Sequence, residues 1–278
     1  MTKISIILPS YNRANLISQT IESCLNQTHK NIELIIVDDC SLDNSVEVIQ
    51  SYIKKDRRIK LIQNKHNKKL PATLNTGFSV ATGDYLTWIS DDNMFTKNAL
   101  EIMLSVLIAE PDIGLVYADY TTIDANGKII TRIHQEPPEY LPIRDCVGAC
   151  FLYRSSIAHL VGRYNENLFL IEDYEFFLRM GLKTQFKHIA QTCYYYRVHT
   201  QSLTQNRKNE IKLAKQNLKK QFVGQYKIPD HLKPIDDLYK WYIEDKSLIS
   251  HIKFIFIIFK HPIITLSYMF RNLCRLKK

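Results

Sequence analysis

One apolar stretch near the N-terminus decides the fold of this chain: Ile32-Glu33-Leu34-Ile35-Ile36-Val37-Asp38-Asp39. A short run rich in isoleucine, leucine and valine is typical of a buried β-strand, and this one ends in two carboxylates. Similar runs lie at Ile4–Leu8, Ile59–Gln63 and Tyr85–Ile89, separated by segments with helical spacing. This alternation predicts an α/β fold in which a mostly parallel central sheet carries helices on both faces.

The helical segments between these runs complete the pattern. In the first half, apolar spacing predicts helices at 15–26, 43–54, 71–81 and 96–110. In the second half the pattern predicts strands at 114–120, 129–133 and 192–198 and helices at 172–182 and from 208 onward. Prolines predict a loop at 135–145 and a break in the last helix at 229–234. In parallel sheets ligands bind beyond the carboxyl ends of the strands, so we look for chemistry there.

The composition excludes several classes of protein. The chain has 278 residues, of which 45% are hydrophobic and 23% charged, so we expect one large folded core with an appendage rather than a disordered or fibrous chain. The formal net charge is +9, and six of the basic residues lie in an acid-free segment, 250–278. A positive charge concentrated at one end argues against nucleic acid as a partner and for an anionic surface that this end contacts.

The C-terminal segment predicts a membrane-surface contact. Phe254–Phe259 is apolar on every side and stands between Lys253 and Lys260, and Pro262 then interrupts the pattern. No run of 18 apolar residues occurs, so we expect no spanning helix but an interfacial helix attracted to anionic lipid. The alternative is a helix that packs on the core or on a second copy of the chain in a homodimer.

The cysteines and the N-terminus predict a cytosolic protein. Six cysteines are scattered without any C-x-x-C pair, which favours buried free thiols in a reducing compartment. The N-terminal Ile4–Leu8 run has neither the flanks nor the length of a signal peptide.

Three acidic motifs follow predicted strands or begin predicted helices: Asp38-Asp39, Asp91-Asp92 and Glu172-Asp173. Each alone could be a helix cap or a turn former. Adjacent carboxylates repel unless a cation or donor lies between them, so Asp91-Asp92 favours a hard divalent ion such as Mg²⁺ or Mn²⁺. The chain has no phosphate-binding G-x-x-x-x-G-K-[ST] loop and no G-x-G-x-x-G after the first strand.

The order of these motifs resembles that of family 2 glycosyltransferases of the GT-A (Rossmann-like) fold. The resemblance covers roughly residues 3–205 and rests on six motifs in sequence: Pro9-Ser10-Tyr11-Asn12-Arg13, Val37-Asp38-Asp39-Cys40-Ser41, Asn75-Thr76-Gly77, Ala81-Thr82-Gly83-Asp84-Tyr85, Ser90-Asp91-Asp92-Asn93 and Glu172-Asp173. It implies a catalytic domain at 1–205 and a helical, basic C-terminal extension at 206–278.

The resemblance also implies a donor site. Pro9, Ser10 and Tyr11 would frame the nucleotide base, and Asp39 would accept a hydrogen bond from it, which makes a uracil nucleotide the first expectation. Lys69 falls where similar enzymes often place a basic residue near the nucleotide, although its place in the run Lys65–Lys69 slightly favours a solvated loop lysine. Arg197 would help to neutralise the diphosphate.

The metal site and the base follow from the same resemblance. Asp91 and Asp92 match the metal-and-ribose motif, with Asp92 as direct ligand and His199 as a further metal ligand. Ser90 and Leu74 depart from the pattern, since relatives often carry an acid and an arginine there. Asp173 matches the general base, with Glu172 in reserve and a helix-capping role as the alternative.

These implications predict an inverting, metal-dependent transferase. It would move one sugar from a nucleotide-sugar donor, UDP-linked by preference, to a hydroxyl of an acceptor. The basic tail, by itself, favours as acceptor a glycan or lipid-linked glycan at the inner face of the membrane, during surface polysaccharide biosynthesis. Two alternatives remain: a sugar-nucleotide pyrophosphorylase, and a non-catalytic scaffold that binds nucleotide sugars.

Overall fold

The computed structural model describes residues 2–200, 202–222 and 224–237, and the predicted tail segment Phe254–Phe259 lies outside them. The strands are β1 Ile4–Ser10, β2 Ile32–Asp38, β3 Ile59–Gln63, β4 Tyr85–Trp88, β5 Met94–Phe95, β6 Ile113–Ile123, β7 Ile129–Ile133, β8 Phe151–Arg154 and β9 Gln185–Arg197. The helices are α1 Ile17–Leu25, α2 Ser45–Ile53, α3 Lys69–Phe78, α4 Ala99–Ala109, α5 Ser155–Val161, α6 Glu172–Gly181, α7 Leu203–Asn206 and α8 Lys208–Phe222. Two short 3₁₀ turns, Pro138–Tyr140 and Asp230–Leu232, complete these elements.

All these strands join one sheet, in the order β3-β2-β1-β4-β8-β6-β9-β5, with β7 paired to the side of β6. The first four strands run parallel, as predicted from the alternation of strand and helix. The second half is mixed, because β8 is antiparallel to both β4 and β6 while β9 is parallel to β6. The α/β class is therefore confirmed, and the sheet is parallel in its N-terminal half and mixed beyond it.

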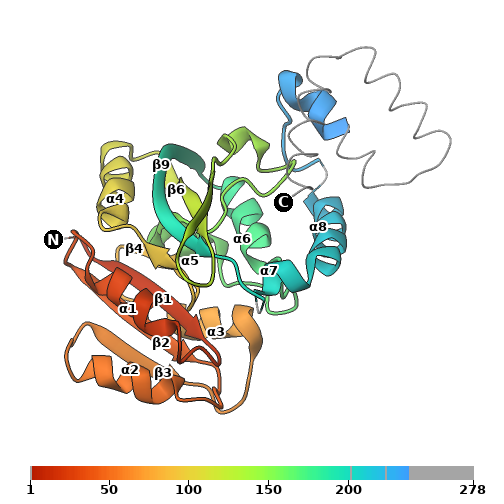
Figure 1. Ribbon diagram of the computed structural model, residues 1–278. Coiled ribbons are helices and arrows are strands. Elements are labelled where there is room, and N and C mark those ends of the chain that lie inside the picture. The colour runs from red at the N-terminus through yellow and green to blue at the C-terminus, as the bar shows by residue number, and fades with distance from the viewer. Residues whose placement is uncertain (1, 201, 223, 238–278) are drawn as a thin grey trace.

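Helices cover both faces of the sheet, as Figure 1 shows. Along β1 and β2, alternate residues point to opposite faces, so Ile6 and Leu34 join one core cluster and Ile7 and Ile35 the other. The first cluster includes the apolar sides of α1, α2 and α4, and the second those of α3, α6 and α8. Every residue of both strands is buried, which explains why the two runs are continuously apolar.

Helix α3 lies unusually close to the sheet. Gly77 faces β1 and β2 so tightly that a Cβ atom there would collide with the side chain of Ile7 and come within 3.1 Å of Val37 Cγ2. The glycine of the Asn75-Thr76-Gly77 motif therefore has a packing role, because a larger side chain would push the helix away from the strands.

Strand β8, helix α5 and the first residues of β9 were not predicted from the sequence. Strand β8 is a run of four residues that leads directly into α5, and a short apolar run of this kind cannot be assigned by periodicity. Strand β9 begins at Gln185 rather than at Thr192, since its first residues also pair with β6. These residues show no alternation of apolar and polar side chains, so the sequence did not predict them as strand.

Helix α8 packs onto the core beside α6. Leu218 is buried within the second core cluster, and Ile211, Ala214 and Phe222 pack against the same cluster from one side of the helix. Beyond it, Leu232 and Ile235 form a small cluster with Ile143. None of the helices in the described ranges is long and apolar enough to span a bilayer.

The cysteines of the described residues carry free thiols. Cys24, Cys146, Cys150 and Cys193 are buried, and Cys40 is half-buried. Burial raises the pKa of Cys24 and of Cys146 to about 12, so these thiols remain protonated and behave as small apolar side chains.

Candidate functional site

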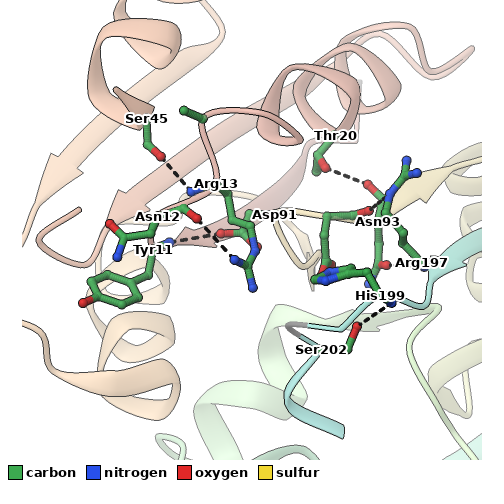
Figure 2. Close-up of polar contacts among 12 residues, drawn as sticks. Tyr11, Asn12, Arg13, Thr20, Ser45, Asp91, Asn93, Arg197, His199 and Ser202 are labelled. Atoms are coloured by element: carbon green, nitrogen blue, oxygen red, sulfur yellow. Dashed lines mark hydrogen bonds and ion pairs between the residues drawn. The ribbon is translucent and has the colours of Figure 1, made fainter. Parts of the chain in front are cut away.

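The loop after β1 brings Tyr11 to the surface beside Asp91. Tyr11 is 41% exposed, whereas Pro9 and Ser10 are buried within the end of β1. The backbone N–H of Tyr11 donates to Asp91 Oδ2 at 3.0 Å, a contact that Figure 2 shows. An exposed phenol ring at the carboxyl end of a parallel strand is accessible to a planar ligand, and the stacking of Tyr11 on a nucleotide base stays a prediction.

Asn12 ties the same loop to the loop after β2. Its φ of 54° lies in the left-handed region, which asparagine tolerates better than most residues. Its N–H donates to Ser41 Oγ and its side-chain oxygen accepts from the N–H of Leu42. The ends of β1 and β2 are thereby held together, with Tyr11 next to them.

Asp39 shapes the segment that leads into α3. Its carboxylate accepts bonds from Asn64 Nδ2 and from the backbone N–H groups of Lys68 and Lys69, at 2.8 to 2.9 Å. Asp39 is 4% exposed, so these contacts balance the cost of burying its charge. The side chain predicted to read a base thus also anchors the loop around it.

Lys69 begins α3 in a left-handed backbone conformation, with a φ of 67°. Its exposed side chain extends over the ring of Phe169, with Nζ 5.7 Å from the ring centroid. Phe169 comes from the segment before α6, so Lys69 lies between the predicted donor loop and that segment.

The Asp91-Asp92-Asn93 segment lies between β4 and β5, beside the end of β1. Asp91 receives the N–H of Tyr11, and its Oδ1 lies 3.5 Å from Arg13 Nε. Burial, and next the charge of Asp92, raise the pKa of Asp91 to about 7. Two adjacent carboxylates in a site of this kind favour a nearby cation, and the role of Asp91 and Asp92 in binding a metal stays a prediction.

Asp92 faces His199 across the end of β9. His199 Nε2 lies 2.9 Å from Asp92 Oδ2, and the two side chains are 9% and 14% exposed. The N–H of His199 donates to Ser202 Oγ, which fixes the turn after β9 (Figure 2). The two residues predicted from the sequence to be metal ligands therefore lie side by side, and their binding of a metal stays a prediction.

Arg197 holds β9 against this segment. It is 2% exposed, and its guanidinium donates to acceptors within the chain: the carbonyls of Asp92, Asp124 and Ala125 and the side-chain oxygen of Gln19. Its backbone N–H donates to Asn93 Oδ1. These contacts do not support the predicted diphosphate contact, since the donors that a phosphate would need are already bonded.

Arg197 instead helps to hold Asp92 and His199 opposite each other. By bonding the backbone carbonyl of Asp92, it ties the strand that carries His199 to the segment that carries Asp92. Asn93 extends this link, because its backbone carbonyl accepts from Thr20 of α1 while its side chain accepts from β9 (Figure 2).

The residues at this point fit a divalent ion. Within the described ranges no three His, Cys, Asp or Glu side chains converge as a complete metal site. Asp92 Oδ2 and His199 Nε2 lie close enough to bind one ion together, and a diphosphate ligand would complete its coordination, as is common for Mg²⁺. A carboxylate and an imidazole also suit Mn²⁺.

Asp173 lies in the first turn of α6, which begins after Ile171. The N-cap position belongs to Ile171, so Asp173 is not the capping residue; its Oδ1 accepts the N–H of Tyr174 at 2.7 Å. The side chain is half-buried, whereas Glu172 is 4% exposed. Of the two acids, Asp173 is the one that a substrate can reach.

The pKa values of the two acids also favour Asp173 over Glu172 as the proton acceptor. Burial, and next the charge of Asp145, raise the pKa of Asp173 to about 6. The pKa of Glu172 rises further, to about 8, because of burial and the neighbouring charge of Asp173. Since the two carboxyls interact, the more buried Glu172 retains the proton and Asp173 carries the charge near neutral pH. A carboxylate whose pKa lies just below neutral is suited to accept a proton.

Tyr196 on β9 lies within electrostatic reach of both Asp92 and Asp173. Burial raises the pKa of its phenol, and the charges of Asp92 and Asp173 both add to this effect. Asp92 and Asp173 are therefore both near one side chain, although they come from distant parts of the chain.

Two further charged residues lie near Asp173 and were not predicted from the sequence. Asp145 precedes β8 and Lys215 belongs to α8, and their side chains form an ion pair at 3.1 Å. Nothing in the local sequence marks either residue, because their proximity depends on how α8 packs.

A cavity of about 550 Å³ lies along the outer side of α3. Its lining includes His66 and Lys68 from the loop that Asp39 anchors, and Arg163 and Glu166 from the segment before α6. Asn75 closes its inner side, because its amide bonds the backbone of Tyr164 and the side chain of Glu166. The cavity thus shares a loop with the Asp39 site but does not include the paired acids.

Comparison with known proteins places these features in a family. Residues 5–161 match the family described as "Glycosyl transferase family 2". The chain is 30% identical over 220 residues to "UDP-Glc:alpha-D-GlcNAc-diphosphoundecaprenol beta-1,3-glucosyltransferase WfaP" of Escherichia coli, covering 76% of this chain and 83% of that protein. It is 27% identical over 267 residues to a chondroitin synthase of Pasteurella multocida (strain Pm70), covering 91% of this chain but 28% of the synthase.

A solved structure shares the fold. A mannosyltransferase from Pyrobaculum calidifontis, in complex with GDP-Man and Mn²⁺, superposes with a TM-score of 0.68 at 15% identity, covering 97% of this chain and 79% of that one. At this level of identity the similarity concerns the fold.

Proposed function

The chain belongs to glycosyl transferase family 2, and from that premise we propose that it transfers one sugar from a nucleotide-sugar donor to a hydroxyl of an acceptor, with inversion at the anomeric carbon. The observation that carries this proposal is the half-buried Asp173, which is ionised near neutral pH and lies within electrostatic reach of the same tyrosine as Asp92.

In the proposed reaction Asp173 takes the proton from the acceptor hydroxyl. The hydroxyl oxygen forms a bond to the anomeric carbon as the bond from that carbon to the nucleoside diphosphate breaks. The leaving group departs with both electrons of that bond, and the proton stays on Asp173. This role requires an ionised, accessible carboxylate, and Asp173 meets both conditions better than Glu172.

The donor would bind at the carboxyl ends of β1 and β2. Tyr11 offers a ring for the base, and Asp39 and Lys69 border the same loop. A uracil nucleotide is supported by the name of the Escherichia coli relative, which uses UDP-glucose. Asp92 and His199 would hold a divalent ion, Mn²⁺ or Mg²⁺, which would neutralise charge on the diphosphate.

The acceptor would be a lipid-linked glycan in surface polysaccharide assembly. The same relative is named for a diphosphoundecaprenol acceptor, and the acid-free basic segment 250–278 suits an anionic membrane surface. We further propose that residues 1–205 form the catalytic domain, that 206–278 form an extension, and that the protein acts at the inner face of the membrane.

Membership of this family disfavours the pyrophosphorylase alternative, and the presence of Asp39, Asp91-Asp92 and Asp173 in their motifs disfavours a non-catalytic scaffold. Both alternatives remain outcomes of the tests, through pyrophosphate release in the first case and inactivity in the second.

Thermal unfolding of the full chain tests the donor site. We expect UDP to raise the unfolding temperature more than GDP or ADP, and to do so only with Mn²⁺ or Mg²⁺, because ligand binding to the folded state alone stabilises it. Asp92→Asn should abolish the metal-dependent part of this shift, whereas Lys220→Gln, on the exposed end of α8, should not change it. Equal shifts with all nucleotides, or a shift independent of metal, would contradict the proposed donor site.

A further inference from the structure

Asp145 and Lys215 form a charged pair beside the proposed base. Lys215 Nζ lies 3.1 Å from Asp145 Oδ2, with the two side chains 26% and 14% exposed. The same ammonium lies 5.3 Å from the centroid of the Tyr174 ring, the residue that follows Asp173. Lys215 is therefore held at the start of α6 by an anion on one side and an aromatic ring on the other.

The packing of α8 fixes the place of Lys215. Leu218 is 1% exposed, and Ile211 and Ala214 pack against the same core cluster from neighbouring turns. Tyr174 is anchored as well, because its hydroxyl donates to the carbonyl of Leu141. Because both α8 and the Tyr174 ring are fixed by packing, the charge of Lys215 has a fixed position at the start of α6.

The carboxyls near Asp173 outnumber the positive charge described around it. Glu172 precedes it on α6, Asp145 approaches from the segment before β8, and the phenols of Tyr164 and Tyr196 face it from two other segments. Lys215 is the cation whose charge lowers the pKa of both Glu172 and Asp173. Without it, burial and Asp145 would both favour the protonated acid.

We propose that Lys215, held by Asp145 and Tyr174, is a positioning residue that keeps Asp173 ionised and ready to accept a proton. The proposal rests on the proposed function only for the role of Asp173 as the base. It assigns a part of the active site to α8, which lies beyond the residues matched by the family, 5–161. Asp145 acts in the opposite sense, because its charge opposes ionisation of Asp173.

The opposite signs of these two neighbours give a direct test that needs no substrate. The full chain is labelled with ¹³C-aspartate, and the carboxyl signal of Asp173 is assigned by its loss in Asp173→Asn. We expect Lys215→Met to move the titration midpoint of Asp173 upward by about one pH unit, since an opposite charge close to a carboxylate lowers its pKa by about that amount or more. Asp145→Asn should move it downward.

Two controls separate charge from packing. Lys215→Arg retains the charge and should leave the midpoint close to that of the wild type, and Lys220→Gln removes a lysine from the exposed end of the same helix and should not move it. A midpoint that stays at its wild-type value in both Lys215→Met and Asp145→Asn would overturn the proposal. If Lys215→Met does not fold, the downward shift in Asp145→Asn decides alone.

Transfer activity distinguishes this proposal from the proposed function. With a donor that stabilises the protein, Lys215→Met should lose about fivefold in rate at pH 6, because a rise of one pH unit lowers the deprotonated fraction of Asp173 there from about one half to about one tenth, and it should recover toward the wild-type rate at pH 8. If the midpoints move as expected but Asp173→Asn is as active as the wild type, the electrostatic role stands and the assignment of the base fails. An equal loss of rate at every pH would indicate a purely structural role for Lys215 and would overturn the proposal.

Discussion

Asp39 follows strand β2 and Asp173 lies in the first turn of helix α6, and their surroundings give these two aspartates different roles. Asp39 is buried and accepts three hydrogen bonds from the chain, two of them from backbone N–H groups at the start of α3. Asp173 accepts the N–H of Tyr174 and remains half-buried beside other carboxyls. A carboxylate already satisfied by the chain supports a loop, and one that is accessible with a raised pKa can accept a proton.

Replacing the proposed base should slow the reaction strongly without unfolding the protein. We expect Asp173→Asn to lower the transfer rate by about 10²- to 10⁴-fold, because an amide cannot accept the proton and general-base catalysis contributes about that factor. The rate is measured as release of nucleoside diphosphate, and the nucleotide-induced thermal shift should persist. Activity equal to that of the wild type would redirect the assignment to Glu172.

The raised pKa of Asp173 sets a pH dependence for the reaction. Because the base must be deprotonated and burial raises its pKa to about 6, the rate should rise with pH through 6 and level off above it. Below this value we expect a fall of about tenfold per pH unit, since the deprotonated fraction falls by that factor. The measurement is a profile of kcat/KM between pH 4.5 and 8.5, and a profile that is flat between 5 and 7 would contradict it.

At the scale of elements, α3 connects the donor loop to the segment that leads to the base. Its glycine side packs on β1 and β2, and on another side Asn75 bonds the segment before α6. Asn75 Oδ1 accepts the N–H of Tyr164, and its Nδ2 donates to the carbonyl of Tyr164 and to Glu166 Oε1. One buried amide therefore holds two neighbouring segments in register.

Removing this amide should destabilise the fold measurably. We expect Asn75→Ala to lower the free energy of unfolding by about 1–3 kcal/mol, because a buried N–H and carbonyl of Tyr164 lose their partner. Thr76→Ala is the matched control, since the hydroxyl of Thr76 bonds the carbonyl of Ala72 within the same helix, and its effect should stay within about 0.5 kcal/mol. Urea unfolding of both variants measures the difference, and equal effects would contradict the role of Asn75.

At the scale of the whole molecule, one sheet joins residues that are distant in sequence. Strand β9 pairs with β6 and with β5, and so carries His199 to the segment after β4 that holds Asp92. Helix α8 packs against the second core cluster and brings Lys215 to α6. The site is thus assembled from both halves of the fold.

The basic C-terminal segment should direct the protein to anionic membranes. A chain that ends at Ser250 is expected to lose binding to vesicles containing phosphatidylglycerol, because it lacks the six basic residues and the apolar run of 250–278. Cosedimentation at low and high salt measures this, and the full chain should release the vesicles as salt rises. Replacing Lys253 and Lys260 with glutamine is the control for charge alone. Undiminished binding of the shortened chain would contradict the membrane role of this segment.

The sequence by itself determined the α/β class and the carboxylates at the strand ends. Continuous apolar runs such as Ile32–Asp38 can be buried only as central strands, and the acids that follow them must then lie at the edge where ligands bind. Strand β8 and the start of β9 escaped prediction, because a run of four residues and a run without alternation carry no distinctive period.

Only the tertiary structure decided what surrounds each acid. Arg197 was predicted to contact a diphosphate, yet its guanidinium bonds the carbonyls of Asp92, Asp124 and Ala125. Lys215 carried no signal in sequence, yet it lies over Tyr174 and pairs with Asp145. Hydrogen-bond partners, burial and the resulting pKa values depend on contacts between distant segments, and no local pattern of residues encodes these contacts.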